Sequence, residues 1–320
     1  MSRRTSSRRE FLRSSVALAA GTTVPYWLGA PSAKAEPSKP ELKIYMHWDM
    51  EGTSGLFRRD QTWYREKGVP KEVGEEGLKL LMADVNSASA AALKAGADRV
   101  IVCDTHGGGG NLRLDQMLDD PRIMYHPRSR GQVNGVLRWM PDLDTASGLM
   151  LMGHHAKAGT EHAFLPHTNN LEWVDFRING QSVGEIGIEG CYAGHWDVPV
   201  ILVHGDEALG KEAAALFPGV VTACVKRAVT ADLAEGLDAP AARQLVAEKV
   251  TEAIKKLQSA KPAPYKPTLP MRVTMRMRTE KAAEKAAQRP NVKRLDDFTV
   301  ECEVKSQGAV VKWLTGDGVE

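Results

Sequence analysis

Three short apolar runs decide the fold, and each of them ends in polar side chains. The runs are Leu42-Lys43-Ile44-Tyr45-Met46-His47-Trp48, Arg99-Val100-Ile101-Val102-Cys103 and Leu149-Met150-Leu151-Met152. The residues that follow them are Asp49-Met50-Glu51-Gly52, Asp104-Thr105-His106 and Gly153-His154-His155. Apolar residues at helical spacing from Lys71 to Ala95 separate the first two runs, which predicts a parallel strand–helix–strand unit. Because the carboxyl ends of parallel strands meet at one crevice, we expect these polar side chains to converge there.

The rest of the chain continues this alternation. We predict strands at 172–178, 198–203 and 220–228, and helices at 182–193, 207–216 and 240–257. A linker rich in proline and lysine, 259–270, precedes a tail with strands at 271–277 and 298–304 and a helix at 279–288. The sequence therefore predicts a three-layer α/β core with a mainly parallel sheet over residues 36–260. A smaller α+β lobe is expected over 261–320.

The first 35 residues have the features of a twin-arginine signal peptide. Ser7-Arg8-Arg9-Glu10-Phe11-Leu12 carries the arginine pair, an apolar stretch follows, and Ala33-Lys34-Ala35 is a small-x-small cleavage site. A membrane anchor is disfavoured because Gly21 and Pro25 interrupt a stretch too short to span a bilayer. We therefore expect the twin-arginine export machinery as a partner, a periplasmic or otherwise exported location, and no stable membrane insertion after signal removal.

Charge and cysteine content exclude some classes of protein. The chain of 320 residues carries a formal charge of +2, and residues 1–35 hold six basic residues against one acidic residue. The mature chain is thus left with a formal charge of about −3 by side-chain counting, which argues against a nucleic-acid-binding surface. None of the four cysteines forms a C-x-x-C pair, and Cys103 and Cys224 lie in apolar runs where a buried small hydrophobe is expected.

The strand-end residues have the chemistry of metal ligands. Asp49 and Glu51 are two apart, so in extended chain they share a face and repel each other unless a cation lies between them. An acidic loop start is the alternative. Asp104 could orient the imidazole of His106. Adjacent residues of an extended chain face opposite ways, so only one of His154 and His155 can easily point into the site.

Further candidates lie beyond the third run. The loop from Ala158 to Asn170 holds His162 and His167, either of which could be catalytic. Glu185 at a helix start could reach a metal or simply favour the helix dipole. The glycine run 107–110 is either a flexible turn or backbone that approaches a metal or substrate closely.

Several motifs, in order, make the chain resemble the D-aminopeptidases of peptidase family M55 from Lys43 to about Lys226. They are Asp49-Met50-Glu51-Gly52, Asp104-Thr105-His106, Gly153-His154-His155-Ala156-Lys157-Ala158-Gly159-Thr160, Pro166-His167-Thr168 and Asn179-Gly180-x-x-Val183-Gly184-Glu185-x-Gly187. Asp197-Val198-Pro199-Val200 and Gly205-Asp206 follow them. Each motif alone is weak, and their order and spacing together carry the resemblance.

The resemblance implies two zinc ions per subunit, and it places their ligands on Asp49, Glu51, His106, His155 and Glu185. It implies that Asp49 is the bridging carboxylate and that His167 is the catalytic histidine, since the Pro-His-Thr context matches and that of His162 does not. It also implies a homo-oligomer, for which a decameric ring is one form. Trp48 and the glycine run depart from the family pattern near the site and could alter substrate choice.

These features together predict a zinc-dependent aminopeptidase that hydrolyses short peptides, especially peptides of D-amino acids, with a metal-activated water. One alternative is a metal-dependent hydrolase of another amide or an ester. Another is a periplasmic peptide-binding protein without catalysis, which the complete set of site residues disfavours. A purely structural protein would leave the buried carboxylates unexplained.

Overall fold

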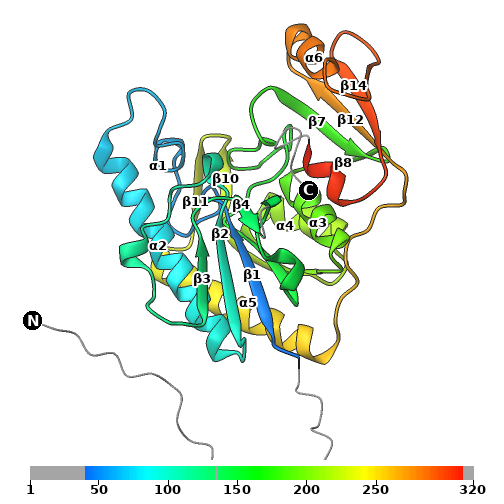
Figure 1. Cartoon of the computed structure of the whole chain (residues 1–320). Coiled ribbons are helices and arrows are strands. Elements are labelled where there is room, and N and C mark those ends of the chain that lie inside the picture. Colours follow the sequence, from blue (N-terminus) through cyan, green and yellow to red (C-terminus); the bar gives the residue numbers. More distant parts are fainter. Residues whose placement is uncertain (1–39, 134–135, 313–320) are drawn as a thin grey trace, which may run out of the picture. The chain divides into compact units, whose positions relative to one another are not determined.

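A seven-stranded sheet lies at the centre of the part of the chain that this computed structural model describes, residues 40–133 and 136–312 (Figure 1). Neighbouring strands pair in parallel except at one edge, where β10 and β11 are antiparallel. The strand order is β11 (Leu233–Gly236), β10 (Val221–Thr230), β9 (Val200–Asp206), β6 (Gly148–Met152), β1 (Lys43–Trp48), β2 (Arg99–Asp104), β3 (Ile123–His126). The predicted signal peptide, 1–35, lies outside the described residues.

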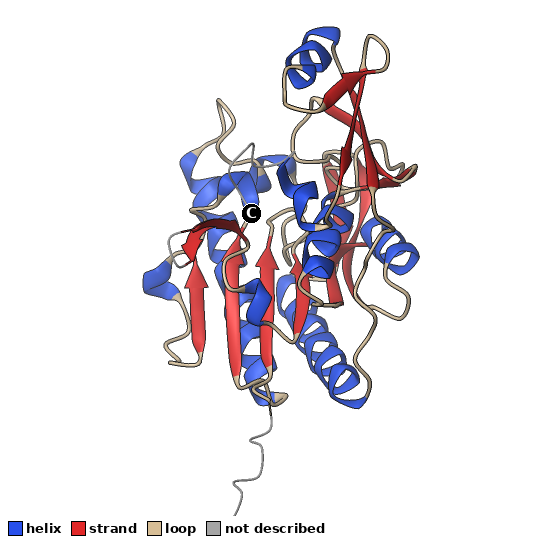
Figure 2. Cartoon of the chain, turned by 45° about the vertical axis from the view of Figure 1, so that its right-hand side comes forward, coloured by secondary structure: helices blue, strands red, loops and turns tan. Residues whose placement is uncertain are grey.

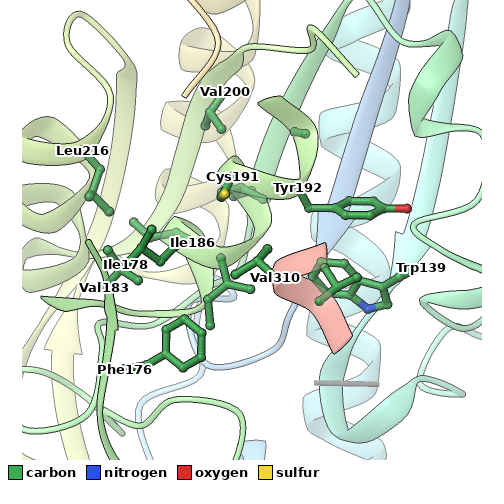
Figure 3. Packing of buried hydrophobic residues seen from close by; sticks show 14 of the residues in the cluster. Trp139, Phe176, Ile178, Val183, Ile186, Cys191, Tyr192, Val200, Leu216 and Val310 are labelled. Atoms are coloured by element: carbon green, nitrogen blue, oxygen red, sulfur yellow. The ribbon is translucent and has the colours of Figure 1, made fainter. Parts of the chain in front are cut away.

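Helices cover both faces of this sheet. Helices α2 (Lys71–Lys94) and α5 (Ala239–Ser259) pack on the face that receives Ile44, Met46 and Trp48. Helices α3 (Glu185–His195) and α4 (Glu207–Leu216) share the other apolar cluster. That cluster includes the edge contact between Trp139 and Tyr192, whose ring centroids are 5.3 Å apart (Figure 3). The period of two along β1 thus divides the side chains between two cores, and the predicted three-layer α/β fold is confirmed.

A second sheet is antiparallel and combines two distant parts of the sequence (Figure 2). Its order is β13 (Val292–Arg294), β14 (Thr299–Val304), β12 (Met271–Met277), β7 (Trp173–Ile178), β8 (Gln181–Val183). Helix α6 (Glu280–Ala287) packs through Ala283 and Ala286 in the apolar cluster that α3 and α4 share. The tail strands at 271–277 and 299–304 therefore join the hairpin at 173–183, and the domain boundary at residue 260 stays a prediction.

The remaining elements are short. They are α1 (Arg59–Thr62), the hairpin of β4 (Arg130–Val133) and β5 (Val136–Trp139), and 3-10 turns at His106–Gly108, Leu114–Gln116, Leu143–Thr145 and Gly308–Val311. No helix in the described ranges has the length and apolarity needed to cross a bilayer. Cys103 is buried as expected, whereas Cys224, for which burial was also expected, is only half-buried.

One predicted boundary is wrong. The helix expected from Ser182 begins instead at Glu185, because residues 181–183 pair with β7 across the Asn179-Gly180 turn. Asn179 and Gly180 both have positive φ, as a two-residue hairpin turn of this type requires. The shift matters for function because it makes Glu185 the first residue of α3.

Candidate metal centre

The loops after β1 and β2 and the start of α3 surround a cavity of about 660 Å³. Five of the six predicted site residues line it, namely Asp49, Glu51, His106, His167 and Glu185. The sixth, His155, is buried beneath the cavity, with its Nε2 atom 3.2 Å from Oε1 of Glu185. The strand order explains this convergence, since β1 lies between β6 and β2 in the sheet.

Asp49 lies at the centre of the group and uses its two oxygens in different directions. Its Oδ1 is 2.8 Å from Nδ1 of His106, and its Oδ2 is 3.4 Å from Nε2 of His155. Burial alone would raise the pKa of Asp49, but the neighbouring imidazoles of His106 and His155 outweigh burial and hold that pKa well below its usual range. Asp49 is therefore ionised and faces both imidazoles, as a bridging carboxylate would.

Two groups of three donors share Asp49. One contains Glu51 and His106, and the other contains His155 and Glu185; within each group the donor atoms lie within 4.8 Å of one another. Oε2 of Glu51 is buried without a hydrogen-bond partner, and it lies 3.3 Å from Nδ1 of His106. Nε2 of His155 is likewise buried without a hydrogen bond. Carboxylate and imidazole donors in this number fit zinc.

The imidazole tautomers fit metal binding as well. Nε2 of His106 lies 3.1 Å from the carbonyl oxygen of Thr62, and Nδ1 of His155 lies 3.0 Å from that of Ala156. A carbonyl oxygen only accepts, so each of these nitrogens carries the proton. The other nitrogen of each ring then faces Asp49, which is the arrangement that backbone carbonyls impose on metal-binding histidines.

His167 lies against this group through its ring. Its imidazole stacks on that of His155, and its Nδ1 donates to the carbonyl oxygen of Leu165 at 2.9 Å. Its Nε2 is 3.8 Å from Oε1 of Glu185 and also belongs to a possible donor group with Glu51 and His155. His162 is exposed and does not line this cavity.

Two further residues support the ligands, and the sequence did not single them out for this role. Nε1 of Trp63 donates to Oε1 of Glu51 at 2.6 Å, and the edge of Trp63 packs on His167 with ring centroids 5.2 Å apart. The backbone N–H of Asn169 donates to Oε1 of Glu185 at 2.7 Å. These contacts orient the two glutamates, and only the folded chain brings their partners together.

Lys226 anchors the loop that carries Glu51. Its ammonium group is buried and donates to the carbonyl oxygens of Glu51, Thr53 and Leu56 at 2.8, 2.7 and 2.5 Å. Burial lowers the pKa of Lys226 to about 7, and nearby carboxylates oppose that effect. A lysine at the end of the apolar run 220–225 is the sequence signal that could have found this residue.

Two expectations about neighbouring residues need correction. Asp104 does not orient His106, because its carboxylate accepts from the backbone N–H and side-chain amide of Asn111 at 2.6 and 2.9 Å. Asn111 in turn donates to the carbonyl oxygen of His106, so Asp104 shapes the loop and not the ring. Trp48 does not border the cavity either, since strand alternation buries its side chain on the α2 and α5 face.

The glycine run serves backbone geometry. All four glycines have positive φ, and a Cβ on Gly109 would lie 2.6 Å from the carbonyl oxygen of Pro127. Gly107 and Gly108 also line the cavity. The loop is therefore a turn at the edge of the cavity, and its close approach to a metal or substrate stays a prediction.

Comparisons with known proteins agree with this geometry. A family model described as peptidase M55, D-aminopeptidase, matches residues 42–315. A D-aminopeptidase of Bacillus subtilis (strain 168) is 33% identical over 231 residues, which cover 71% of this chain and 80% of that relative. The solved structure of the Zn-dependent D-aminopeptidase DppA from Bacillus subtilis, described as a self-compartmentalizing protease, superposes with a TM-score of 0.75 at 28% identity. That match covers 86% of this chain and 96% of the other. The predicted resemblance and the prediction of a peptidase are confirmed, and the chain belongs to peptidase family M55, the family of D-aminopeptidases.

Proposed function

We propose that this protein is a zinc-dependent aminopeptidase that removes N-terminal D-amino acids from short peptides at a site for two zinc ions. The observation that carries the proposal is the position of Asp49, whose two oxygens face His106 and His155 separately. Glu51 completes the donor group on one side and Glu185 completes it on the other. The description of the Bacillus subtilis DppA structure as Zn-dependent supports zinc as the metal.

The proposed chemistry divides between the metal and the chain. Zinc ions held by these donors would polarise the scissile carbonyl and lower the pKa of a water molecule. His167 handles a proton at Nε2, because its Nδ1–H is engaged by Leu165. When the C–N bond breaks, the departing amine must gain a proton. His167 is a protonatable group that stacks on His155 and lies outside the five-donor set of Asp49, Glu51, His106, His155 and Glu185.

Short peptides fit the charges of the cavity. Arg65 and Arg130 line it together with the carboxylate-rich donor set. A short peptide has a carboxylate close enough to its scissile bond to reach a guanidinium while its carbonyl lies at the metals. Longer chains would not present that charge there.

The proposal is tested with two dipeptides. The zinc-loaded protein is assayed against D-Ala-D-Ala and L-Ala-L-Ala, with a chelator-treated sample as the control. Chelator-sensitive cleavage of the D-peptide alone is expected. If neither peptide is cleaved while zinc is confirmed in place, the proposed aminopeptidase activity on dipeptides fails and hydrolysis of another amide or an ester becomes the better account.

We also propose that the protein is a homo-oligomer. The description of the Bacillus subtilis DppA structure as a self-compartmentalizing protease supports this. Light scattering coupled to size-exclusion chromatography measures the mass of the particle in solution, and a decameric ring would give ten times the subunit mass. A particle with the mass of one subunit would contradict the proposal.

Export remains a proposal that rests on residues 1–35. Fusion of this segment to a reporter that matures only when exported folded would test it. Exchange of Arg8 and Arg9 for lysine should retain the reporter in the cytoplasm, because the arginine pair is the element that the twin-arginine route reads. Unchanged export of the double variant would argue against that route.

A further inference from the structure

A second group of metal-binding side chains is buried beside the cavity and lies outside the five-donor set. It consists of His47 on β1, His154 after β6 and Glu189 on α3, each with 1% exposure or less. Nδ1 of His47 is 3.0 Å and Nε2 of His154 is 2.7 Å from the same oxygen, Oε2 of Glu189. Two imidazoles thus converge on one carboxylate oxygen.

The ring nitrogen of His154 that points away from Glu189, the outer nitrogen, forms a hydrogen bond with a carbonyl group. Its Nδ1 lies 3.0 Å from the carbonyl oxygen of Met152, which can only accept. Nδ1 therefore carries a proton. In the neutral ring, Nε2 then presents a lone pair toward Glu189.

The outer nitrogen of His47, Nε2, also forms a hydrogen bond, in this case with the hydroxyl of a serine. The hydroxyl of Ser129 lies 3.1 Å from the carbonyl oxygen of Asp104 and donates its proton there. The Ser129 oxygen, 3.0 Å from Nε2 of His47, must then accept from that ring. Nε2 of His47 carries the proton, and its Nδ1 is left to face Glu189.

Without a cation, the inner nitrogens of this group are poorly satisfied. Nδ1 of His47 makes no hydrogen bond, although it is buried and only 3.0 Å from Oε2 of Glu189. With Nε2 of His47 and Nδ1 of His154 carrying the protons, a lone pair of each neutral ring faces the same carboxylate oxygen. Buried polar atoms that face one another as acceptors are costly unless a cation lies between them.

A divalent cation resolves this conflict. We propose that His47, His154 and Glu189 bind a further divalent cation of the zinc class, separate from the ions bound through Asp49. Two imidazoles and one carboxylate are a donor set that zinc uses where a fourth position stays open. The three donor atoms lie within 4.8 Å of one another, and tetrahedral zinc needs donors about 3.3 Å apart, so small side-chain movements suffice.

The site has access to the substrate cavity. Ser129, Trp139 and Glu189 line that cavity, so its wall includes a residue of the proposed donor set. Glu189 follows Glu185 by one helical turn, which puts both carboxylates on the same face of α3. The two carboxylates therefore serve neighbouring but distinct donor groups.

Zinc stoichiometry tests the proposal with matched variants. The protein is equilibrated with excess Zn²⁺ and desalted, and zinc per subunit is measured by mass spectrometry of the element. Glu189→Gln should hold one zinc ion fewer than the wild type, and His47→Gln should lose the same ion, so that the double variant loses no more. Glu185→Gln, the same exchange one turn earlier, should lose a different ion, so its loss should add to that of Glu189→Gln.

The outcomes separate this inference from the proposed function. Wild-type zinc content in both Glu189→Gln and His47→Gln would overturn the inference and leave the site at Asp49 untouched. A loss in these variants with none in Glu185→Gln would uphold the inference and contradict the proposed catalytic ligands. If the variants fail to fold by circular dichroism, anomalous scattering from zinc-soaked wild-type crystals decides: a peak among the three donors is expected, and its absence refutes the site.

Discussion

The imidazole rings of His155 and His167 are stacked, with centroids 3.8 Å apart and planes inclined by 14°. The stack joins a buried ring that faces Asp49 to a half-buried ring at the cavity wall. His167 thus lies within reach of the metal donors, while its free nitrogen points to the cavity side occupied by Glu185. Nε2 of His167 could either transfer a proton or bind a metal ion, and the two roles predict different effects of removing the ring.

His167→Ala should lower turnover without lowering zinc content. Loss of a group that transfers a proton typically reduces kcat by about 10²–10⁴-fold. Zinc content and kcat are measured on the same preparation. If both fall together, His167 is a ligand, as its proximity to Glu51 and His155 would then explain.

Asp49→Ala should cost both catalytic zinc ions, whereas His106→Ala should cost one. The reason is that Asp49 faces both donor groups and His106 belongs to a single group. Zinc per subunit in the two variants, each compared with the wild type, measures the difference. Equal losses in both variants would mean that Asp49 does not bridge.

Trp63→Phe should weaken zinc binding about 10–100-fold, because it removes the hydrogen bond that orients Glu51 and keeps an aromatic ring beside His167. Competition with a chromogenic chelator gives the dissociation constant. Trp173→Phe, which makes the same exchange in the apolar core, is the control and should bind zinc as the wild type does. Equal affinity in all three proteins would show that the Trp63 bond is dispensable.

Lys226→Met should destabilise the fold by about 2–4 kcal/mol, because three buried carbonyl groups lose their donor together. Urea unfolding of the metal-free protein measures this change. Lys255→Met on the exposed surface of α5 is the matched control, and it should shift stability by less than about 0.5 kcal/mol. A Lys226 variant as stable as this control would contradict the anchoring role.

Asp84 should make stability depend on pH. Burial raises its pKa from 3.8 to about 6, although hydrogen bonds from Ser54 oppose the shift. The folded state therefore holds this proton more tightly than the unfolded state between pH 4 and 6, so stability falls as pH rises through that window. The full shift corresponds to about 3 kcal/mol.

Asp84→Asn should remove this dependence, because the amide does not titrate and still offers an oxygen to the backbone N–H of Ser54. The gain in unfolding free energy over the wild type should thus be larger at pH 7 than at pH 4. Asp115→Asn at an exposed position is the control. A constant difference between Asp84→Asn and wild type across this range would refute the raised pKa.

Much of the architecture could be read from the chain because it follows local periodicity. Alternation along β1 and helical spacing along α2 are properties of neighbouring residues, and both elements were expected within a residue or two of their observed bounds. The same periodicity showed that His154 and His155 must separate. In the structure, His155 faces Asp49 and His154 faces Glu189.

The start of α3 and the partner of Asp104 depend on hydrogen bonds in a turn and a loop, which the periodicity of a helix or strand does not encode. The sequence pattern predicts that Ser182 belongs to a helix, whereas in the structure its pairing with β7 places it in a strand. The sequence suggests that Asp104 is a partner of His106, but in the structure both oxygens of Asp104 accept hydrogen bonds from Asn111. In both cases the competing partner lies across a neighbouring turn or loop, Arg177 for Ser182 and Asn111 for Asp104, and the periodicity of the element itself does not reveal it.

The sequence by itself determined the layered α/β fold and the donor types at the strand ends, because side-chain period and strand direction are local properties. Only the tertiary structure decided which donors meet. The order β6-β1-β2 brings residues 49, 106 and 155 together, and the packing of α3 on the sheet brings Glu189 between His47 and His154. Hydrogen bonds from Trp63 and Lys226 then hold Glu51 and its loop, since burial leaves these polar groups no water to bind instead.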